Sequence, residues 1–313
     1  MTPAIVVFGS LNMDFVVTVD RLPAPGETVL GRDFQMVPGG KGANQACAAG
    51  RAGGRNVLTR MVGRVGYDLF GDSLKASLSA AGVDVSAVHA TRSRPTGVAL
   101  IWVEGSGQNS IVVASGANHA LGAADVAGFR TAFQGASFAL FQLETPMDAV
   151  AAALRMAGEE NIRTILDPAP ARALPGEVLA QVDFLTPNES EACVLLGRPA
   201  ERVAAADASA LAGRLLELGP KAVILKLGDQ GSFYSDGRAS IRCPAFPVQA
   251  RDTTAAGDTF NGSYAVALAE GLGIADALRF ATAAAALSVT RLGAQASIPS
   301  RAEIDEFLAA SRG

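Results

Sequence analysis

Short apolar runs rich in β-branched residues alternate with longer segments rich in alanine and leucine along most of the chain. The short runs predict buried strands at residues 5–8, 138–141, 164–166 and 222–225. The longer segments, several with a polar start and a glycine end, predict helices at residues 43–52, 67–81, 146–158, 188–196 and 204–218. Repeated strand–helix units indicate an α/β fold with a doubly wound, mainly parallel sheet flanked by helices. Ligands are then expected at the carboxyl ends of the strands.

Two regions interrupt this alternation and have no helical pattern that could cover them. Residues 14–38 contain a Pro/Gly turn between short apolar runs, and residues 96–114 have the pattern of a β-hairpin that turns at residues 105–107. We expect the two regions to pair into a small β-sheet that projects from the main domain, as a lid or a dimer contact would. The main α/β domain would then comprise residues 1–13, 39–95 and 115–313.

The composition limits the classes of function. The chain has 313 residues, of which 49% are hydrophobic, and 26 Lys and Arg against 30 Asp and Glu give a net charge of −4. A large core can therefore be buried, and no general attraction to nucleic acid or to an anionic membrane is expected. The amino-terminal segment lacks the features of a signal peptide, and no apolar stretch is long enough to span a membrane. We therefore expect a cytoplasmic protein.

The cysteines and histidines offer little metal or redox chemistry. Cys47, Cys193 and Cys243 lie far apart and show no CxxC spacing, so free thiols in a reducing compartment are the expected state. The two histidines, His89 and His119, are too few for a His-rich metal site.

The strongest candidate for catalytic chemistry is the loop of residues 251–262, which follows a strand-like segment ending near Ala250 and precedes a helical pattern. Its small residues Ala255, Ala256 and Gly257 would let successive backbone N–H groups point at one spot. The dipole of the following helix adds positive potential there. The loop therefore predicts an anion site that needs no Lys or Arg.

Asp258 directly follows these small residues. Taken alone, it fits an acidic residue that stabilises the first turn of a helix. Beside an anion site, it also fits a base that takes a proton from an attacking hydroxyl while the N–H groups stabilise a phosphoryl group in transfer. Because phosphoryl transfer is loose and the proton can move late, the pKa of this carboxyl need not be strongly perturbed.

Polar side chains follow the first predicted strand and open the next helix. Asn12 and Asp14 come directly after that strand, where an amide and a carboxylate could each bridge vicinal hydroxyls or could instead close an Asx turn. In the glycine-rich stretch 39–42 the backbone can approach a ligand closely, and Lys41 and Asn44 supply donors. The stretch lacks the spacing and the Ser or Thr of a Walker A sequence, so we do not interpret it as a phosphate loop.

These segments resemble the signatures of the ribokinase-like carbohydrate kinases. Residues 252–262 resemble the carboxyl-terminal signature of that family, and residues 39–46 (Gly-Gly-Lys-Gly-Ala-Asn-Gln-Ala) resemble the other. Shorter matches occur in family order at residues 9–14, 25–28, 116–118, 188–191 and 290–295. The resemblance implies ATP-dependent phosphorylation of D-ribose at the 5-hydroxyl, which gives ribose 5-phosphate and ADP, with Asp258 as the base and the backbone before it as an anion hole.

The resemblance also implies roles for individual residues. The sugar would be bound by Asn12, Asp14, Gly40, Lys41, Asn44 and Glu144, with Asp258 facing its primary hydroxyl. The nucleotide would contact Asn188, Lys226, Gly228, Gly231, Gly257 and Thr282. An activating K⁺ would be held, mostly by backbone oxygens, at Asp252, Thr254, Ser288, Arg291, Gly293 and Ser297. Mg²⁺ would lie near Asn188 and Glu191, bound through water.

Three of these residues have a second interpretation. Asn188 and Glu191 also have the spacing of a helix N-cap with a capping box. Lys226 stands where many ribokinases have threonine, and it could either reach the ATP phosphates or be a solvated lysine at the end of a strand.

Alternative functions lie both inside and outside this family. A deoxyribose, nucleoside, fructose or 2-keto-3-deoxygluconate kinase would share the same motifs, and a non-catalytic sugar-binding protein would not need the intact anion loop. A dinucleotide-dependent oxidoreductase would need GxGxxG after the first strand, where residues 9–12 are Gly-Ser-Leu-Asn, and is excluded. The β-segments at 14–38 and 96–114 predict a homodimer that forms through the lid.

Overall fold

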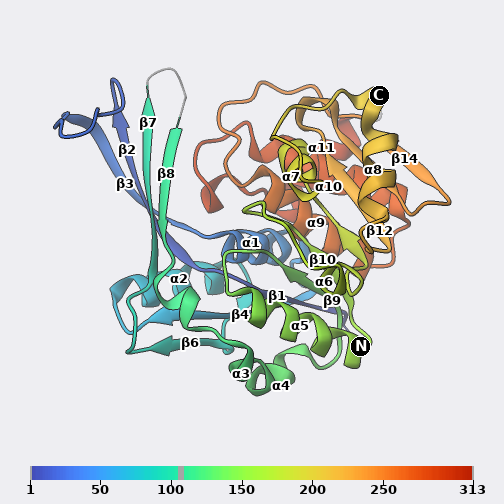
Figure 1. Ribbon diagram of the computed structural model, residues 1–313, viewed down its shortest axis with the longest axis horizontal. Coiled ribbons are helices and arrows are strands. Elements are labelled where there is room, and N and C mark those ends of the chain that lie inside the picture. The colour runs from blue at the N-terminus through green and yellow to red at the C-terminus, as the bar shows by residue number, and fades with distance from the viewer. Residues whose placement is uncertain (1, 105–108, 312–313) are drawn as a thin grey trace.

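The main sheet combines strands from both halves of the chain. The computed structural model describes residues 2–104 and 109–311 (Figure 1). The sheet has the order β14-β13-β12-β11-β10-β9-β1-β4-β5, and β6 also pairs with β4. Its strands are β1 (Ala4–Phe8), β4 (Leu58–Gly66), β5 (Val83–Asp84), β6 (Val88–Thr91), β9 (Ala136–Phe141), β10 (Arg163–Leu166), β11 (Phe184–Leu185), β12 (Ala222–Lys226), β13 (Ser232–Ser235) and β14 (Ser240–Cys243). Pairing is parallel from β5 to β12 and antiparallel from β12 to β14.

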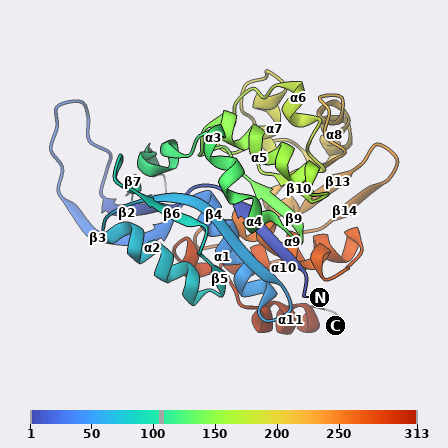
Figure 2. The same cartoon turned by 90° about the horizontal axis from the view of Figure 1, so that it is seen from below.

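Helices cover both faces of this sheet because its strands are apolar on both faces. In β1, Ile5 and Val7 pack into one core cluster, whereas Val6 and Phe8 pack into the other. Figure 2 shows the sheet between the two groups of helices. One group consists of α1 (Lys41–Gly53), α2 (Leu69–Ala80), α9 (Ala256–Ala269), α10 (Ile274–Ser288) and α11 (Arg301–Ala310). The other consists of α3 (Ala123–Val126), α4 (Arg130–Phe133), α5 (Met147–Glu159), α6 (Gly176–Leu179), α7 (Glu189–Leu195) and α8 (Ala208–Leu216).

A second, four-stranded sheet projects from the main body beside α1 and α2 (Figure 1). Its strands are β2 (Asn12–Val19), β3 (Gly31–Gly39), β7 (Gly97–Glu104) and β8 (Asn109–Ala114), in the order β3-β2-β7-β8. β2 and β7 are parallel, and the outer pairs are antiparallel. The predicted pairing of the two interrupting regions is confirmed, and the predicted hairpin turn at residues 105–107 lies outside the described residues.

The structure confirms the predicted α/β architecture, with one local correction. The segment that ends near Ala250 is not a strand, because residues 244–250 have no regular secondary structure. Pro244 and Pro247 lack the N–H groups that a strand would donate, so the ladder ends with β14. Short 3₁₀ helices occur at Gly116–Ala120, Ala127–Phe129, Ala205–Asp207, Gly228–Gln230 and Gln295–Ser297. Among the described residues, no helix has the length and apolar character that crossing a membrane requires.

Candidate active site

The first turns of α1 and α9 meet beside the carboxyl end of β1. At Gly262 of α9, a Cβ atom would lie 2.5 Å from the Gln45 carbonyl oxygen and 2.7 Å from the Ala48 Cβ, so only glycine lets the two helices pack this closely. The Ala43 N–H donates to the Ser10 carbonyl over 2.9 Å, which anchors the start of α1 directly after β1. Two motifs that are far apart in the sequence therefore share one site.

The Asp258 carboxylate is buried between these helices, with only 6% of the residue exposed. Asn44 Nδ2 donates to its Oδ2 over 3.1 Å, and Gln45 Nε2 donates to its Oδ1 over 3.0 Å. Burial raises the pKa of Asp258 to about 6; the Lys41 ammonium opposes this rise, and the Asp167 carboxylate adds to it. Asp258 is therefore fixed in orientation and mostly ionised at pH 7, as a proton acceptor must be.

The backbone before Asp258 forms the amino terminus of α9. Ala255 is the N-cap residue and has a φ of 60°, a left-handed conformation that costs an alanine about 1 kcal/mol and is typical of functional loops. The Ala256 N–H donates to the Thr253 carbonyl over 3.2 Å. In the part of the chain that the structure describes, the N–H groups of Gly257 and Asp258 have no acceptor. These two groups are thus available to an anion at the helix terminus.

Asn12 and Asp14 lie on β2, in the pairing with β3 and β7, so neither closes an Asx turn. Asn118 Nδ2 donates to the Asn12 Oδ1 over 2.7 Å, which leaves the Asn12 amide nitrogen as a donor. Asp14 is 8% exposed, and its burial, with repulsion from Glu144 and Asp258, raises its pKa to about 7. Asn118 therefore holds Asn12 in place, and Asp14 lies close enough to Asp258 for the two carboxylates to repel each other.

Lys41 is the first residue of α1, and Glu144, in the loop after β9, contacts it. Glu144 Oε2 accepts from the Ser10 hydroxyl over 2.6 Å and from the Lys41 backbone N–H over 3.0 Å. Gly40, the N-cap of α1, has a φ of +88°, and a Cβ there would lie 2.7 Å from a backbone nitrogen of β2. Burial by itself lowers the pKa of Lys41, but the surrounding carboxylates, Asp258 foremost, raise it above its ordinary value. The ammonium therefore stays charged beside Asp258.

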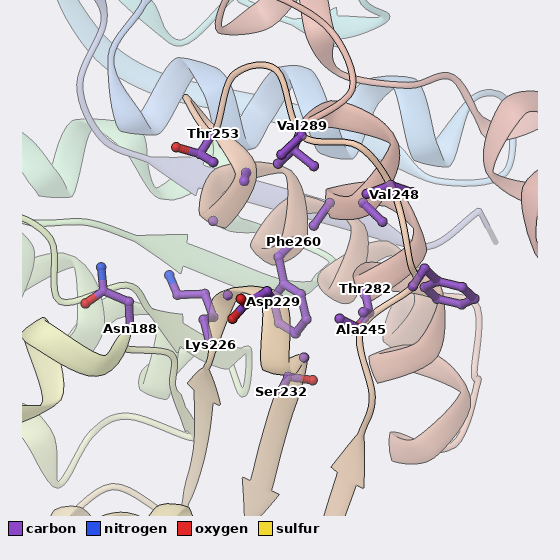
Figure 3. A pocket seen from close by; sticks show the side chains of 18 of the residues that line it. Asn188, Lys226, Asp229, Ser232, Ala245, Val248, Thr253, Phe260, Thr282 and Val289 are labelled. Carbon is purple, nitrogen blue, oxygen red and sulfur yellow. The ribbon is translucent and has the colours of Figure 1, made fainter. Parts of the chain in front are cut away.

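A cavity of about 670 Å³ opens beside the amino terminus of α9. In Figure 3, Asn188 and Lys226 lie on one side of it, Val248 and Thr282 lie on the other, and Phe260 lies between them. Lys226, Gly228, Thr253 and Gly257 form its polar end. The rest is mostly apolar and includes Phe246, Pro247, Val248, Phe260, Ala285 and Val289. The volume is that of a typical small-molecule site, and the lining fits a flat apolar ring with a polar tail.

The interpretation of Lys226 as a solvated lysine is wrong. Its side chain is 13% exposed, and Nζ lies 2.8 Å from Oδ1 of Asp167, whose own side chain is 3% exposed. A Cβ atom at Gly257 would lie only 3.2 Å from Nζ, so the ammonium lies against the first turn of α9. The residue joins the polar end of the cavity to a buried carboxylate.

Several buried polar residues that support these side chains were not predicted: Ser10, Gln45, Asn118, Gln142 and Asp167. Asp167 and Gln142 directly follow β10 and β9. Their position right after a buried parallel strand could have identified them as candidate site residues. Gln45 and Asn118 lie inside the matched motifs, but their contacts depend on the tertiary packing.

Asn188 and Glu191 form the capping box that their spacing allows. The Asn188 side chain accepts from the Glu191 N–H over 2.8 Å, and Glu191 Oε2 accepts from the Asn188 N–H over 2.7 Å. Burial raises the pKa of Glu191, Lys226 opposes this rise, and Asp167 adds to it. One carboxylate oxygen of Glu191 remains beyond the cap.

The residues predicted around K⁺ come from two loops that Asp252 ties together. Asp252 Oδ1 accepts from the Thr254 N–H over 2.9 Å, and Oδ2 accepts from the Gly293 N–H over 2.9 Å. The Arg291 guanidinium pairs with Glu303 over 2.6 Å, so only the backbone of Arg291 is available at the loops. The Ser288 and Ser297 hydroxyls donate to carbonyl oxygens of their own turns. The side-chain oxygens of Asp252, Ser288 and Ser297 are thus engaged in contacts within the loops, which leaves backbone carbonyls as the oxygen donors for a hard cation.

The described part of the chain has no cluster of His, Cys, Asp or Glu side chains for a metal ion and no disulfide. Residues 2–104 and 109–311 contain no group of three or more His, Cys, Asp or Glu side chains that could hold a metal ion. Cys47, Cys193 and Cys243 are buried free thiols.

Comparison with known proteins agrees with this site. Residues 2–301 match the model of the pfkB family of carbohydrate kinases. The chain is 43% identical over 304 residues to a ribokinase of Bacillus subtilis, with 97% of this chain and 99% of the relative covered. It is 40% identical over 309 residues to a ribokinase of Haemophilus influenzae, with 98% and 99% covered. The structure of Arabidopsis thaliana ribokinase complexed with ribose and ATP matches with a TM-score of 0.89 at 36% identity, covering 98% of this chain and 99% of that one. The chain therefore belongs to the pfkB family of carbohydrate kinases, as its motifs predicted.

Proposed function

We propose that this carbohydrate kinase transfers the terminal phosphoryl group of ATP to the 5-hydroxyl of D-ribose and releases ribose 5-phosphate and ADP. The observation that carries the proposal is the position of Asp258. Its carboxylate is fixed by Asn44 and Gln45 and lies near the polar groups of β2. The free N–H groups of Gly257 and of Asp258 itself lie at the edge of the cavity. The identity to ribokinases over nearly the whole chain supports ribose as the acceptor.

In the proposed reaction, Asp258 accepts the proton of the attacking hydroxyl as the oxygen–phosphorus bond forms. The attacking and leaving oxygens lie in line on either side of the phosphorus. The N–H groups of Gly257 and Asp258 stabilise the negative charge on the equatorial oxygens of the phosphoryl group. Ala255 and Ala256 set the geometry of this anion hole by forming the left-handed N-cap and the first helical residue. The rise in the pKa of Asp258 to about 6 makes its carboxylate a stronger base while leaving it mostly ionised at pH 7.

The proposed sugar site consists of hydrogen-bonding groups that suit a neutral polyol. Asn12, Asp14 and Glu144 offer an amide and two carboxylates, and Lys41 and Asn44 supply donors. Asp14 has no described hydrogen-bond partner within residues 2–104 and 109–311, although it is buried. Vicinal hydroxyls would satisfy this carboxylate, and binding would thereby compensate for its desolvation.

The cavity is the proposed ATP site. The adenine would lie against the apolar wall near Phe260 and Thr282, and the phosphates would lie at the polar end near Lys226, Gly228 and Gly257. Asn188 and Gly231 also line that cavity. Lys226 has three charged donors, of which one is bound to Asp167, and the other two suit a polyphosphate.

Two ions are proposed at this end of the site. Mg²⁺, held near Asn188 and Glu191 through water, would neutralise charge on the phosphates. K⁺ in the oxygen-rich loops around Asp252 would hold the anion loop in place, because Asp252 ties that loop to the loop of Gly293. Turnover in K⁺ buffer should exceed turnover in Na⁺ buffer of equal ionic strength, and equal rates would contradict the K⁺ proposal.

The second sheet, residues 14–38 and 96–114, is proposed as a lid over the sugar and as a homodimer contact. Asp14 is on one face of this sheet. On the other face, Met36, Leu100 and Val112 share one cross-strand row and are exposed. Such an apolar row suits a second copy of the chain. Val112→Glu should then give monomers in light scattering, whereas Leu292→Glu, at an exposed position elsewhere, should not.

The buried free cysteines fit the proposed cytoplasmic location.

A panel of acceptors tests the proposed reaction. ADP formation should be fastest with ribose, and slower with 2-deoxyribose, fructose, 2-keto-3-deoxygluconate and nucleosides. Higher kcat/KM with any of these would assign the chain to another kinase of the family. Binding of ribose without any ADP formation, at any acceptor concentration, would identify a non-catalytic sugar-binding protein.

A further inference from the structure

A continuous line of polar contacts connects the nucleotide cavity to the base. Gln45 Nε2 donates to Oδ1 of Asp258 over 3.0 Å and to Oδ2 of Asp167 over 2.9 Å. The other oxygen of Asp167 accepts from Lys226 Nζ over 2.8 Å. The line runs Lys226–Asp167–Gln45–Asp258. Its last three members are buried, and the Lys226 side chain is partly exposed.

The orientation of the Gln45 amide is fixed by its neighbour. Gln142 Nε2 donates to Gln45 Oε1 over 2.6 Å, so the oxygen of Gln45 is occupied and its NH₂ group must face the two carboxylates. The space for Gln142 depends on Gly9, where a Cβ atom would lie 2.0 Å from Gln142 Oε1. Both protons of the Gln45 amide are therefore used, one for each aspartate.

The ion pair at the far end of the line lies between two environments. Asp167 is buried directly after the carboxyl end of β10, whereas Lys226 lines the cavity and lies next to Gly257. A buried carboxylate that loses its cation is strongly disfavoured, so Asp167 and Lys226 are held together in the absence of a ligand. A phosphate at the polar end of the cavity would compete with Asp167 for the donors of Lys226.

We propose that Asp167, acting through Gln45, is a positioning residue for Asp258, and that its ion pair with Lys226 transmits nucleotide binding to that carboxylate. The proposal rests on the proposed function, since it takes Asp258 as the base and the cavity as the nucleotide site. Neither Asp167 nor Gln45 contacts the reacting atoms in this scheme; each acts by holding Asp258.

The charged groups around Asp258 decide the sign of the expected effects. Lys41 faces it from α1, Asp14 from β2, and Asp167 from the end of β10, with Lys226 behind Asp167. Asp167→Asn removes a like charge that helps to raise the pKa of Asp258, and it leaves the Lys226 cation unpaired. Both changes favour the ionised form of Asp258, so the acid limb of kcat should move to lower pH.

The experiment compares four variants of the full chain. Asp167→Asn should lower kcat about tenfold, because Gln45 and Lys226 donate to different oxygens of Asp167 and asparagine replaces one of these oxygens by an NH₂ donor. The acid limb of this variant should lie at lower pH. The double variant Asp167→Asn with Lys226→Thr replaces the ion pair by a neutral pair. At saturating ATP it should recover kcat to within about threefold and return the limb toward that of the unmodified protein, whereas KM for ATP should rise because the phosphates lose the Lys226 cation. Gln45→Met, which removes the amide at similar volume, should lose kcat without a matching loss of ribose affinity. Asp183→Asn is the matched control.

Asp183 resembles Asp167 in its contacts, since it pairs with Lys221 over 2.7 Å and accepts from Thr164, but it lies near the amino ends of the strands. Asp183→Asn should change neither kcat nor the pH profile. Circular dichroism and thermal unfolding check that each variant is folded. Unchanged kcat and pH profile in Asp167→Asn would overturn the proposal, and a double variant no better than the single one would overturn the role of the ion pair. Full activity of Asp258→Asn would instead overturn the proposed function.

Discussion

Asn44 Nδ2 lies 3.1 Å from Oδ2 of Asp258, although 214 residues separate the two along the chain. The contact joins the first turn of α1 to the first turn of α9, and it occupies one oxygen of the Asp258 carboxylate. With Gln45 on the other oxygen, both oxygens of the carboxylate are held, which fixes its orientation. The site is therefore organised before either substrate binds.

Replacing the base tests the centre of the mechanism. Asp258→Asn should lower kcat by about a thousandfold or more, because the amide cannot accept the proton, while ADP affinity stays within about threefold. Quench-flow or steady-state detection of ADP measures the loss. Asp276→Asn is the matched control, since Asp276 also occupies the first turn of its helix, α10, and is exposed. Comparable losses in the two variants would mean that Asp258 acts only as a helix-stabilising residue.

The pH dependence of kcat should report the pKa of Asp258. Because burial raises this pKa to about 6, the carboxylate is ionised above that pH and protonated below it. The rate should be constant near pH 8, fall to half near pH 6, and decrease about tenfold for each further unit. Direct quantification of ADP in quenched samples avoids the pH dependence of coupling enzymes. A rate that stays constant down to pH 4.5 would contradict a titrating base at this pKa.

Asp14 should lower the stability of the unliganded protein. Its pKa is raised by burial from 3.8 to about 7, so the folded state binds the proton more tightly than the unfolded state. The penalty is absent below pH 3.8, grows as the pH rises, and is constant above about pH 7. Asp14→Asn should therefore raise the free energy of unfolding by about 2 kcal/mol or more at pH 8, and by less at pH 5.

The same variant should bind ribose more weakly, because an amide replaces a carboxylate that accepts from hydroxyls. Urea unfolding at the two pH values and calorimetric titration with ribose measure the two effects. A loss of stability at pH 8 would contradict the raised pKa, and unchanged ribose affinity would remove Asp14 from the sugar site.

Gly97 should control sugar affinity through Asn12. A Cβ atom at Gly97 would lie 2.3 Å from the Asn12 Oδ1 and 2.5 Å from the Asn118 Nδ2, so Gly97→Ala must displace the contact that holds Asn12. We expect KM for ribose to rise about tenfold and KM for ATP to change little. Gly213→Ala in α8, where no atom lies within 4 Å of the added Cβ, is the control and should leave both constants unchanged. Equal KM values for ribose in the two variants would show that Asn12 has no part in sugar binding.

The sequence by itself determined the architecture and the location of the chemistry. Strands such as residues 5–8 and 138–141 are apolar at every position, and a strand of this kind is stable only when helices cover both faces of its sheet. Asn12 and Asp14 were placed at the carboxyl end of the first strand because parallel strands bring those ends to one edge, and Asn44 and Asp258 were located through the motifs of residues 39–46 and 252–262. Short-range rules were sufficient for these features.

Only the tertiary structure decided how these residues act on one another. The burial of Lys226, its pairing with Asp167 and the raised pKa of Asp258 depend on distances between segments that no local pattern encodes. Residues 244–250 were predicted as strand-like and are irregular, although Pro244 and Pro247 were a local signal against a strand. The place of this segment in the cavity wall had no local signal. Desolvation and charge–charge interaction vary with the packing around each group, so chemistry that depends on them appears only when the helices and strands are assembled.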